Sequence, residues 1–309
     1  MNNLNKAKTN HIEIKSSEEG QRLDNFLLKT LKNIPRSLVY KFIRSGQVRV
    51  NKKRTKQLYR IKSKDIIRIP PYIYPGEVID KKLTVDPTKY IHFENDDFML
   101  LNKPSGIAVH SGTSQKFDFL SSLKKVMNCN SLSLIHRLDK NTSGCLLIAK
   151  SYKSSSFLGK AMMNGLFSKK YIALLYGVIN KNVISVSNKI LKDTLNQKMV
   201  ISKSEGKDAS TVFKVIKRYE KYTLVQALIE TGRTHQVRVH AHALGHPIVG
   251  DKKYTLEKFK SDCIGFCNRL FLHSDYISFK YDRQYEFNLD LPNDLKEVLS
   301  LLEIDNDRR

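Results

Sequence analysis

Acidic residues are scarce in this sequence. Its 309 residues include only 30 Asp and Glu against 54 Lys and Arg, which gives a formal net charge of +24 at pH 7. So large a positive excess favours a polyanionic partner over a small metabolite, and nucleic acid is the default candidate. A membrane surface is the competing candidate, but the basic segments do not set bulky apolar residues opposite a basic helix face. We therefore expect no membrane partner.

Long apolar runs are missing as well. Residues 1–15 contain no apolar core of a signal peptide, and no stretch approaches the roughly 18 apolar residues that a membrane-spanning helix needs. Cysteine is also rare, and no second Cys or His pair at zinc-finger spacing accompanies Cys263 and Cys267. We expect a cytoplasmic protein whose four cysteines, Cys129, Cys145, Cys263 and Cys267, are free thiols.

The composition is that of a globular protein large enough for two domains. With 40% apolar and 27% charged residues, a chain of this length buries a core of ordinary size. Pro70, Pro71, Pro75 and Gly76 stiffen the chain and end strand pairing, so they indicate a domain boundary. We expect a flexible tail over residues 1–15, a first domain over 16–72, a linker over 73–88 and a second domain over 89–309.

The first domain shows the pattern of a helix pair followed by a small hairpin. Ser16 and Glu19 form a capping-box signal, and the apolar residues that follow keep helical spacing. A second periodic stretch ends at Gly46, and alternating apolar residues follow it. The predicted elements are a helix from Ser16, a second helix over 36–45, strands around 48–50 and 66–69, and a turn near Asn51.

Over half of the net charge lies in the first quarter of the chain. Residues 1–73 hold 18 Lys and Arg against 5 Asp and Glu. Such a surface neutralises phosphates without reading bases, so it fixes position and orientation rather than sequence. A solvated basic face without any partner is the alternative interpretation. The predicted nucleic-acid contacts of this domain are Arg22, Arg36, Lys41, Arg44, Arg49, Lys52 and Lys53.

The stretch over residues 136–144 carries the strongest chemical signal. Its apolar flanks, residues 132–135 and 146–149, are predicted to be core strands, which places Asp139 on a tight connection between them. An Asp followed by Asn, Thr, Ser and Gly is also good turn chemistry, and most such carboxylates only accept hydrogen bonds from nearby backbone N–H groups. On these residues alone, both interpretations stand.

Two stretches downstream carry further candidate residues. Residues 169–177 are predicted to form a strand with Tyr171 near its start, where a half-buried aromatic residue is common. Residues 231–240 contain Arg233 and Arg238. Four histidines in and after this stretch suggest a metal site, but their spacing fits no closed zinc pattern, so we expect no metal. These histidines are His235, His240, His242 and His246.

Residues 136–144, the loop-like residues 103–106 and residues 231–240 resemble three motifs of the RluA family of pseudouridine synthases, and Tyr171 stands where the family pattern has a tyrosine. The resemblance implies that Asp139 is the catalytic residue and that Arg238 pairs with it. It implies that Tyr171 lies against the target base and that Arg137 displaces the base or holds the phosphate beside it. Arg233 is the remaining predicted RNA contact.

Residues 18–72 resemble an S4-type RNA-binding domain, and residues 48–71 look most like the RluC branch, whose members modify several uridines of large-subunit ribosomal RNA. The resemblance implies an α+β fold. A small S4-like αα-hairpin domain would precede a catalytic domain with a mixed, mostly antiparallel β-sheet core flanked by helices. The expected partner is large-subunit (23S) ribosomal RNA or a ribosome-assembly intermediate, bound by a monomer.

The implied reaction converts uridine to pseudouridine: the bond from ribose C1′ to N1 breaks, the base turns, and C1′ joins C5. No atom is gained and no redox change occurs, so we expect no cofactor. The uracil has to be flipped out of its stack. A carboxylate in a dry cleft needs a counter-charge, which we expect Arg238 to supply through paired hydrogen bonds to Asp139.

Two other classes of function stay open. A non-catalytic RNA-binding or ribosome-assembly protein could use the first domain alone, with a decayed synthase domain behind it. A metal-dependent or two-carboxylate hydrolase acting on nucleosides would need a second carboxylate across the scissile bond. Loss of Asp139 or Arg238 would favour the first class, and both residues are present.

Overall fold

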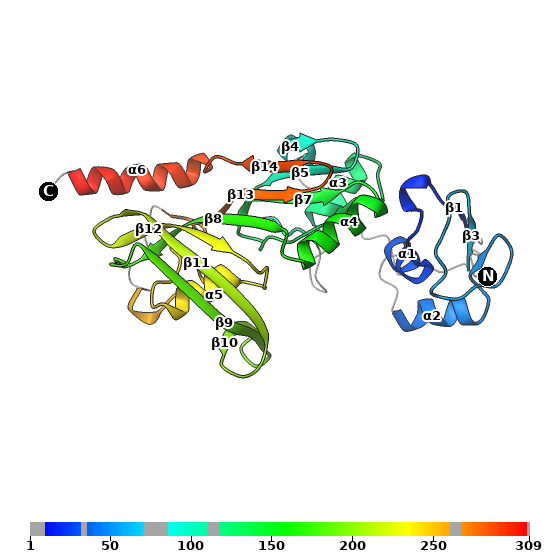
Figure 1. Cartoon of the computed structure of the whole chain (residues 1–309), viewed down its shortest axis with the longest axis horizontal. Helices are drawn as coiled ribbons and strands as arrows, with labels where there is room; N and C mark the ends of the chain where they lie inside the picture. The colour runs from blue at the N-terminus through cyan, green and yellow to red at the C-terminus, as the bar shows by residue number, and fades with distance from the viewer. Residues whose placement is uncertain (1–9, 32–35, 71–85, 111–117, 260–266, 308–309) are drawn as a thin grey trace, which may run out of the picture.

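The structure is a computed structural model, and it describes residues 10–31, 36–70, 86–110, 118–259 and 267–307. Residues 10–70 form a small unit, which we call the N-terminal unit, and residues 86–307 form a larger one, the sheet unit (Figure 1). Both contain helices and strands, so the predicted α+β organisation is confirmed.

In the N-terminal unit, a sheet with the order β1-β3-β2 packs against two helices. Leu23 and Leu27 on the first helix, Val39 on the second and Ile67 in the sheet are all buried in one core. Each helix therefore turns one apolar face inward. The elements are β1 (Asn10–Glu13), the 3₁₀ turn η1 (Ser16–Glu18), α1 (Leu23–Thr30), α2 (Arg36–Arg44), β2 (Arg49–Val50) and β3 (Ile66–Ile69).

The prediction of a flexible tail over residues 1–15 is wrong for residues 10–15. β1 pairs antiparallel with β3, with Asn10 opposite Ile69 and Glu13 opposite Ile66. Ile14, which follows the strand, is 1% exposed. A polar sequence suits an edge strand because only one of its faces meets the core. Residues 1–9 lie outside the described part of the chain.

The first helix begins later than the capping-box signal at Ser16 predicts. The chain makes only the short turn η1, and then Gly20 adopts a left-handed φ of +86° that breaks the helical path. Arg22 is extended, and α1 begins at the next residue. The other elements follow prediction: α2 covers the expected range, and the turn after β2 lies at Asn51, with φ of 48°.

The sheet unit is built on an 11-stranded sheet with the order β10-β9-β11-β12-β8-β13-β7-β5-β4, in which β14 adds to β13 and β6 adds to β7. Only β13 and β7 pair in parallel among the described strands, so the predicted mixed, mostly antiparallel sheet is confirmed. The strands are β4 (Ile91–Glu94), β5 (Phe98–Lys103), β6 (Ser133–Leu134), β7 (Ser143–Ala149), β8 (Phe167–Tyr176), β9 (Val183–Asp193), β10 (Lys198–Ser202), β11 (Lys207–Arg218), β12 (Tyr222–Ile229), β13 (Leu272–Lys280) and β14 (Gln284–Asn288).

Helices pack onto this sheet and close its core. Leu146 and Ile148 of β7 and Leu174 of β8 are fully buried in the main apolar cluster, to which α3 contributes Leu123. No helix in the described part of the chain is long and apolar enough to cross a membrane. The helical elements are η2 (Pro87–Tyr90), α3 (Phe119–Val126), α4 (Tyr152–Met163), α5 (Gln236–Ala243), η3 (Glu257–Phe259) and α6 (Asn293–Asp307).

The predicted linker over residues 73–88 lies almost entirely outside the described residues. Its last two residues do not behave as a linker, because they already belong to η2. Pro87 is buried, and η2 lies against α3. The sheet unit therefore begins slightly earlier than predicted.

The N-terminal unit contacts the sheet unit beside α4 (Figure 1). Nζ of Lys29 on α1 donates to the carbonyl of Ser131 over 3.1 Å, and burial lowers the pKa of Lys29. Nη1 of Arg60 lies 3.5 Å from the hydroxyl of Tyr152, at the start of α4. Ser131 immediately precedes Leu132 and β6, so the contact lies at the start of β6, opposite the last residues of β7.

Candidate active site

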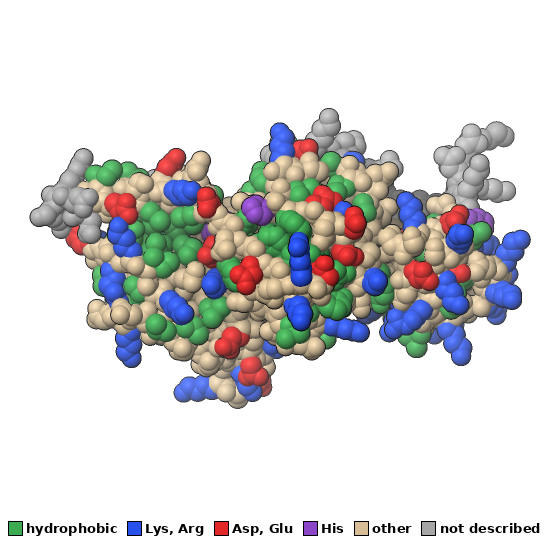
Figure 2. Space-filling model, turned by 45° about the horizontal axis from the view of Figure 1, so that its top comes forward, with side chains coloured by type: hydrophobic (Ala, Val, Ile, Leu, Met, Phe, Trp, Pro, Cys, Tyr) green, Lys and Arg blue, Asp and Glu red, His purple; other side chains and the backbone are tan. Residues whose placement is uncertain are grey.

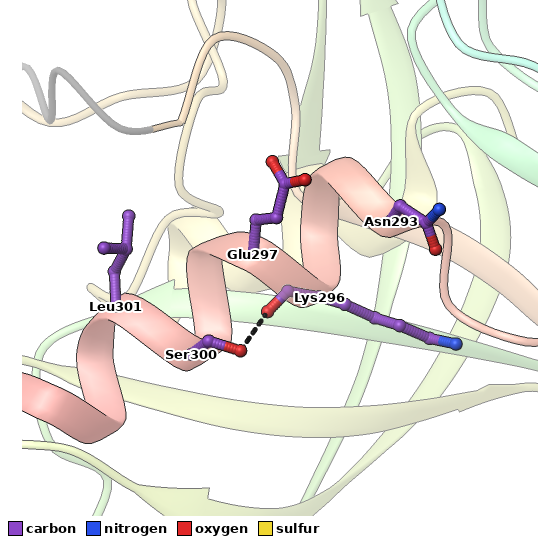
Figure 3. A pocket seen from close by; sticks show the side chains of 5 residues that line it. All are labelled: Asn293, Lys296, Glu297, Ser300 and Leu301. Atoms are coloured by element: carbon purple, nitrogen blue, oxygen red, sulfur yellow. Dashed lines mark hydrogen bonds between the residues drawn. The ribbon is translucent and has the colours of Figure 1, made fainter.

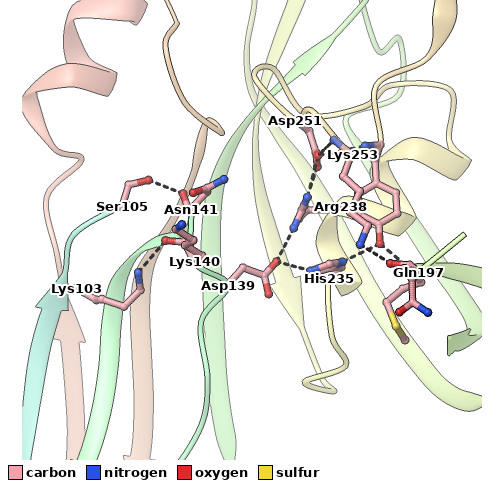
Figure 4. A network of polar contacts seen from close by, with 12 residues as sticks. Lys103, Ser105, Asp139, Lys140, Asn141, Gln197, His235, Arg238, Asp251 and Lys253 are labelled. Atoms are coloured by element: carbon pink, nitrogen blue, oxygen red, sulfur yellow. Dashed lines mark hydrogen bonds and ion pairs between the residues drawn. The ribbon is translucent and has the colours of Figure 1, made fainter. Parts of the chain in front are cut away.

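Asp139 lies on the connection between β6 and β7, as its apolar flanks predict. Ser133 stands opposite Ala149, at the far end of β7, so the chain has to turn back between the two strands. The N–H of Thr142 donates to the carbonyl of Asp139 over 3.1 Å, which closes the turn. The backbone of Asp139 thus serves the turn, while its side chain points toward Arg238 and His235 (Figure 4).

A buried lysine at the end of β5 holds this loop from the other side. Nζ of Lys103 donates to the carbonyls of Pro104, Ile107 and Lys140 over 2.7, 2.9 and 3.2 Å. An ammonium group has three N–H bonds, and each has an acceptor here. Burial lowers the pKa of Lys103 to about 7, against the opposing charge of Asp139. Lys103 therefore joins the loop after β5 to the loop of Asp139.

Arg238 and Asp139 meet as predicted. Nη1 of Arg238, on α5, donates to Oδ2 of Asp139 over 2.9 Å (Figure 4). The two side chains are 11% and 23% exposed, so solvent screens this ion pair less than it would a pair on the surface. Oδ1 of Asp139 has no polar partner among the described residues. One carboxylate oxygen is held, and the other is open.

The paired hydrogen bonds of Arg238 go to a different carboxylate, so the prediction of paired bonds to Asp139 is wrong. Nε and Nη2 of Arg238 donate to Oδ2 and Oδ1 of Asp251 over 2.7 and 2.9 Å. The side chain of Asp251 is fully buried and also accepts the backbone N–H groups of Lys253 and Tyr254. Because Nε and Nη2 of Arg238 both bind Asp251, only Nη1 donates to Asp139, through one hydrogen bond.

The two carboxylates hold the guanidinium in its charged form. Burial by itself lowers the pKa of Arg238, but the hydrogen bonds and charge of Asp251, together with those of Asp139, outweigh burial and raise the pKa above its ordinary value. The site therefore keeps one fixed cation between two acids.

His235 and Tyr254 complete the polar network. Nε2 of His235 lies 3.7 Å from Oδ2 of Asp139, and its Nδ1 lies 2.7 Å from the hydroxyl of Tyr254. The guanidinium carbon of Arg238 stands 4.9 Å from the centre of the Tyr254 ring, a cation–π distance. Both residues therefore contact the ion pair or its support.

Tyr171 lies on β8 and is almost wholly inside the core, at 7% exposed. Burial raises the pKa of its phenol above the ordinary value, although a hydrogen bond with Ser274 opposes this shift. The phenol is therefore neutral at physiological pH, and a resting phenolate base is disfavoured. The negative charge of Asp139 also raises the pKa of this phenol.

The four histidines that suggested a metal site have separate partners. Nδ1 of His240 faces the Thr211 hydroxyl, and Nδ1 of His242 and of His246 face backbone carbonyls. No group of three or more His, Cys, Asp or Glu able to hold a metal ion occurs in the part of the chain that the structure describes. The structure therefore brings only His235 to Asp139.

The predicted nucleic-acid contacts fall into two groups. Three of them form hydrogen bonds within the protein. Arg22 forms an ion pair with Asp24 through two hydrogen bonds, and Arg49 donates to the carbonyls of Gly46 and Lys52. Nε of Arg233 donates to the carbonyl of Asp208. The others have exposed side chains. These are Arg36, Lys41, Arg44, Lys52, Lys53 and Arg137.

Lys and Arg side chains stand out over the N-terminal unit, on the right in Figure 2, whereas the sheet unit also shows apolar side chains between its charges. Arg137 is exposed on the loop that carries Asp139. The exposed cations among the predicted contacts therefore lie on the N-terminal unit, apart from Arg137, which is on the loop that carries Asp139.

Sequence reasoning missed Lys103, Asp251, Tyr254 and His235 as parts of one network. Asp251 follows Gly250, and a Gly-Asp dipeptide indicates only a turn. A signal was nonetheless available for Lys103, because it follows the apolar run of residues 98–101, and a charged residue beside a buried strand needs a partner. The pattern could not say which partner.

A shallow hollow along α6 lies apart from this network. It is lined by Asn293, Lys296, Glu297, Ser300 and Leu301, and the hydroxyl of Ser300 donates to the carbonyl of Lys296 over 3.2 Å (Figure 3). It contains none of the residues around Asp139.

Comparison with known proteins gives both units a family. Residues 97–243 match the sequence family described as RNA pseudouridylate synthase, and residues 21–67 match the S4 domain. The first match contains Asp139, Tyr171 and Arg238, and the second contains the helix pair and hairpin of the N-terminal unit. The predicted S4-like domain is confirmed.

Whole-chain relatives point the same way. The chain is 38% identical to "Ribosomal large subunit pseudouridine synthase C" of Haemophilus influenzae over 305 residues, which is 94% of each chain. It is 41% identical to the protein of that name from Buchnera aphidicola subsp. Schizaphis graminum, over 89% of this chain and 91% of the relative. Among solved structures, human RNA Pseudouridylate Synthase Domain Containing 4 is 25% identical, with a TM-score of 0.58, over 70% of this chain and 94% of that one. The chain therefore belongs to the RNA pseudouridylate synthases, carries an S4 domain ahead of its synthase domain, and is an isomerase that forms pseudouridine.

Proposed function

We propose that this synthase converts uridines of large-subunit (23S) ribosomal RNA to pseudouridine and that Asp139 is its essential carboxylate. The relatives named for the large ribosomal subunit support this substrate, because they are similar over nearly the whole chain and include the S4 domain. The ion pair between Asp139 and Arg238 is the observation that carries the proposal.

Asp139 suits the chemistry because it is both charged and accessible. Arg238 binds Oδ2, and Oδ1 has no polar partner among the described residues. The carboxylate is therefore pre-organised: Arg238 holds one oxygen in place and the other is open to a ligand, so the group needs little reorganisation during the reaction. Asp139 would act on the extruded nucleoside through Oδ1.

Two neighbouring residues have supporting roles in this proposal. Tyr171 is a buried side chain whose phenol has a raised pKa, which supports a packing role against the uracil more than a role as a base. Arg137 is exposed on the same loop, where it could enter the space that the flipped base leaves or bind the adjacent phosphate. A flipped base with a nearby cation is favoured because the phosphate charge is neutralised.

The S4 domain would dock the RNA through its exposed cations. Arg36, Lys41, Arg44, Lys52 and Lys53 are free to contact phosphates, whereas Arg22 and Arg49 support the fold. We propose that the enzyme works as a cytoplasmic monomer on ribosomal RNA or an assembling subunit. One chain supplies Asp139, Arg238 and Asp251, which supports a site complete without a second copy.

The other classes of function fit less well. A decayed synthase domain would not be expected to keep Asp139 and Arg238 at 2.9 Å. For a two-carboxylate hydrolase, Asp251 is a second acid joined to Asp139 through Arg238, but Arg238 binds both of its oxygens. It cannot activate a water molecule as the mechanism of such a hydrolase requires.

Pseudouridine mapping tests the proposal. Ribosomal RNA from cells that lack this protein should lose pseudouridine at defined positions in the large-subunit RNA, and the wild-type gene should restore them. Asp139→Asn should not restore them, because the amide cannot carry the charge. Asp96→Asn, a change at an exposed acid of the same unit, is the matched control and should restore them. Unchanged maps without the protein, or restoration by Asp139→Asn, would contradict the proposal.

A further inference from the structure

His235 has an unusual backbone and a ring held between two functional groups. It is the residue just before α5, with φ of 56° and ψ of 19°, which is the left-handed region. Its Nε2 faces Oδ2 of Asp139 at 3.7 Å, and its Nδ1 lies 2.7 Å from the Tyr254 hydroxyl (Figure 4). A non-glycine residue in this region is uncommon and stores strain, so a function that requires its position is worth seeking.

The hydrogen bonds of Tyr254 favour one tautomer of His235. The hydroxyl oxygen of Tyr254 accepts the backbone N–H of Met199 over 3.0 Å, so its own hydrogen is free to be donated. The acceptor in reach is Nδ1 of His235. A neutral imidazole that accepts at Nδ1 has its hydrogen on Nε2. That N–H points toward Asp139.

The surroundings of His235 keep the imidazole neutral. Burial lowers its pKa, the charge of Asp139 opposes this shift, and the cations Arg238 and Lys253 add to it. Asp251 is the remaining charged group that acts on the ring, and its effect opposes the lowering. The lowered pKa and the contact with Tyr254 therefore both favour a neutral imidazole with its hydrogen on Nε2.

We propose that His235 is a positioning residue for Asp139: its Nε2–H, fixed by Tyr254, restrains Oδ2 beside Arg238 and leaves Oδ1 directed to the nucleoside. This inference rests on the proposed role of Asp139. At 3.7 Å the contact is longer than a hydrogen bond, and hydrogen bonds in ligand-free sites commonly shorten when substrate closes the site. His235 thus acts on the reaction only through Asp139.

Tyr254 supports both groups that meet at Oδ2. Its hydroxyl sets the tautomer of His235, its ring lies under the guanidinium of Arg238, and its backbone N–H donates to Asp251 over 3.2 Å. The residue is 4% exposed, so its position is fixed by packing. Removing the hydroxyl alone should therefore disturb His235 while the support of Arg238 persists.

The test compares two substitutions at His235. His235→Gly removes the imidazole and relieves the backbone strain, so the variant should fold at least as well as the wild type. We expect its single-turnover rate at saturating RNA to fall by about tenfold to a hundredfold, the value of one hydrogen bond to a charged group, with unchanged RNA affinity. Added imidazole should restore part of that rate. His235→Ala keeps the strain and should lose the same activity and also melt at a lower temperature.

Tyr254→Phe is the second arm, with Tyr219→Phe as its control. Tyr219 also carries a cation over its ring, Lys217 at 5.4 Å, but it lies away from Asp139. Tyr254→Phe should lower the single-turnover rate without changing RNA affinity, and Tyr219→Phe should be normal. A wild-type rate in His235→Gly, or a loss that imidazole does not restore, overturns the inference. The rates of the wild type and of Asp139→Asn are measured beside these variants. If the proposed function is wrong, the wild type itself will be inactive, and this outcome differs from a failure of the inference about His235.

Discussion

At the scale of single residues, the site depends on one guanidinium shared between two carboxylates. Arg238 uses Nε and Nη2 on Asp251 and Nη1 on Asp139. Only arginine has a planar group that can serve two partners in this way, because a lysine ammonium is a compact point charge. Asp251 therefore fixes the direction from which Arg238 approaches Asp139.

Arg238→Lys should keep the charge and lose most of the activity. A lysine at position 238 cannot bind both acids. If its ammonium binds Asp251, Asp139 can change rotamer; if it binds Asp139, the buried oxygens of Asp251 lose their partner. Since a displacement of about 1 Å costs roughly a hundredfold in rate, we expect at least that loss in single-turnover pseudouridine formation. Arg283→Lys, at an exposed position of the same unit, is the control. Near-normal rates in Arg238→Lys would show that the fork has no role.

The sequence made part of this arrangement predictable. The pairing of Asp139 with Arg238 followed from the resemblance of their two stretches to motifs of the RluA family. The role of Asp251 did not, because Gly250 and Asp251 look like an ordinary turn and the partner of the acid lies 13 residues away. Lys103 was seen only as part of a loop, since nothing in a linear pattern shows that three carbonyls converge on one ammonium.

At the scale of elements, the loop of Asp139 depends on the parallel contact between β7 and β13. Ser274 stands opposite Gly144, the second residue of β7. Gly144 has φ of +111°, and a Cβ there would overlap the carbonyl oxygen of Ser274. The two backbones approach so closely only because residue 144 has no side chain.

Gly144→Ala should therefore be severely destabilising. It forces strand separation directly after the loop that carries Asp139 and also requires a φ that alanine avoids, so we expect a loss of more than about 4 kcal/mol in the free energy of unfolding. Denaturant unfolding measures it. Gly159→Ala is the matched control: Gly159 lies within α4 with no heavy atom near its added Cβ, and alanine should stabilise that helix by about 0.5–1 kcal/mol. Equal effects of the two changes would disprove the close-approach argument.

Acid should weaken the N-terminal unit through two buried carboxyls. Burial raises the pKa of Asp24 and of Asp65, but hydrogen bonds outweigh burial and bring both below the ordinary value of 3.8. Asp24 accepts from Arg22 and Tyr40, and Asp65 from Asn51 and Tyr59. A carboxyl whose folded pKa is depressed stabilises the fold above its unfolded pKa, and this stabilisation is lost as the pH falls through the folded value.

We therefore expect amide exchange in α1, α2 and β3 to accelerate as the pH falls below about 4, after correction for the intrinsic exchange rate. Asp65→Asn should exchange faster already at pH 7 and show a smaller further change on acidification. Asp96→Asn serves as the control. If Asp65→Asn kept the full acid response, Asp65 would not contribute to it.

Elements with clear periodicity were predictable, and those shaped by backbone detail were not. α2 and the strands beside Asp139 followed from apolar spacing and matched the structure. The first helix did not begin at Ser16, because Gly20 takes a left-handed φ that no pattern of apolar residues reveals. β1 was missed because its polar sequence lies at a sheet edge, where little apolar surface is needed.

At the scale of the whole molecule, charge and catalysis are concentrated in different units. The N-terminal unit brings exposed cations, and the sheet unit brings Asp139 and its support. Composition alone predicted this division, because residues 1–73 hold 18 basic residues against 5 acidic ones. The contact of Lys29 with Ser131 was not predictable, since both residues are individually unremarkable in sequence.

The salt dependence of RNA binding tests that division. Replacing Lys41, Arg44, Lys52 and Lys53 by Gln should weaken RNA binding and reduce the slope of log affinity against log salt by about 0.7 for each phosphate that is no longer neutralised, or about 3 in total. The single-turnover rate at saturating RNA should stay unchanged, because none of these residues lies at Asp139.

The matched control carries the same charge change on the sheet unit, at Lys214, Lys221, Lys280 and Lys296, whose side chains are also exposed. Because basic side chains neutralise phosphates only where the RNA lies, these four changes should alter the slope much less. Fluorescence anisotropy across a salt series measures both slopes with one RNA fragment. Equal slopes for the two variants would mean that net charge, rather than the S4 surface, attracts the RNA. A lower single-turnover rate at saturating RNA in the variant of the N-terminal unit would mean that this unit acts on catalysis as well as on binding.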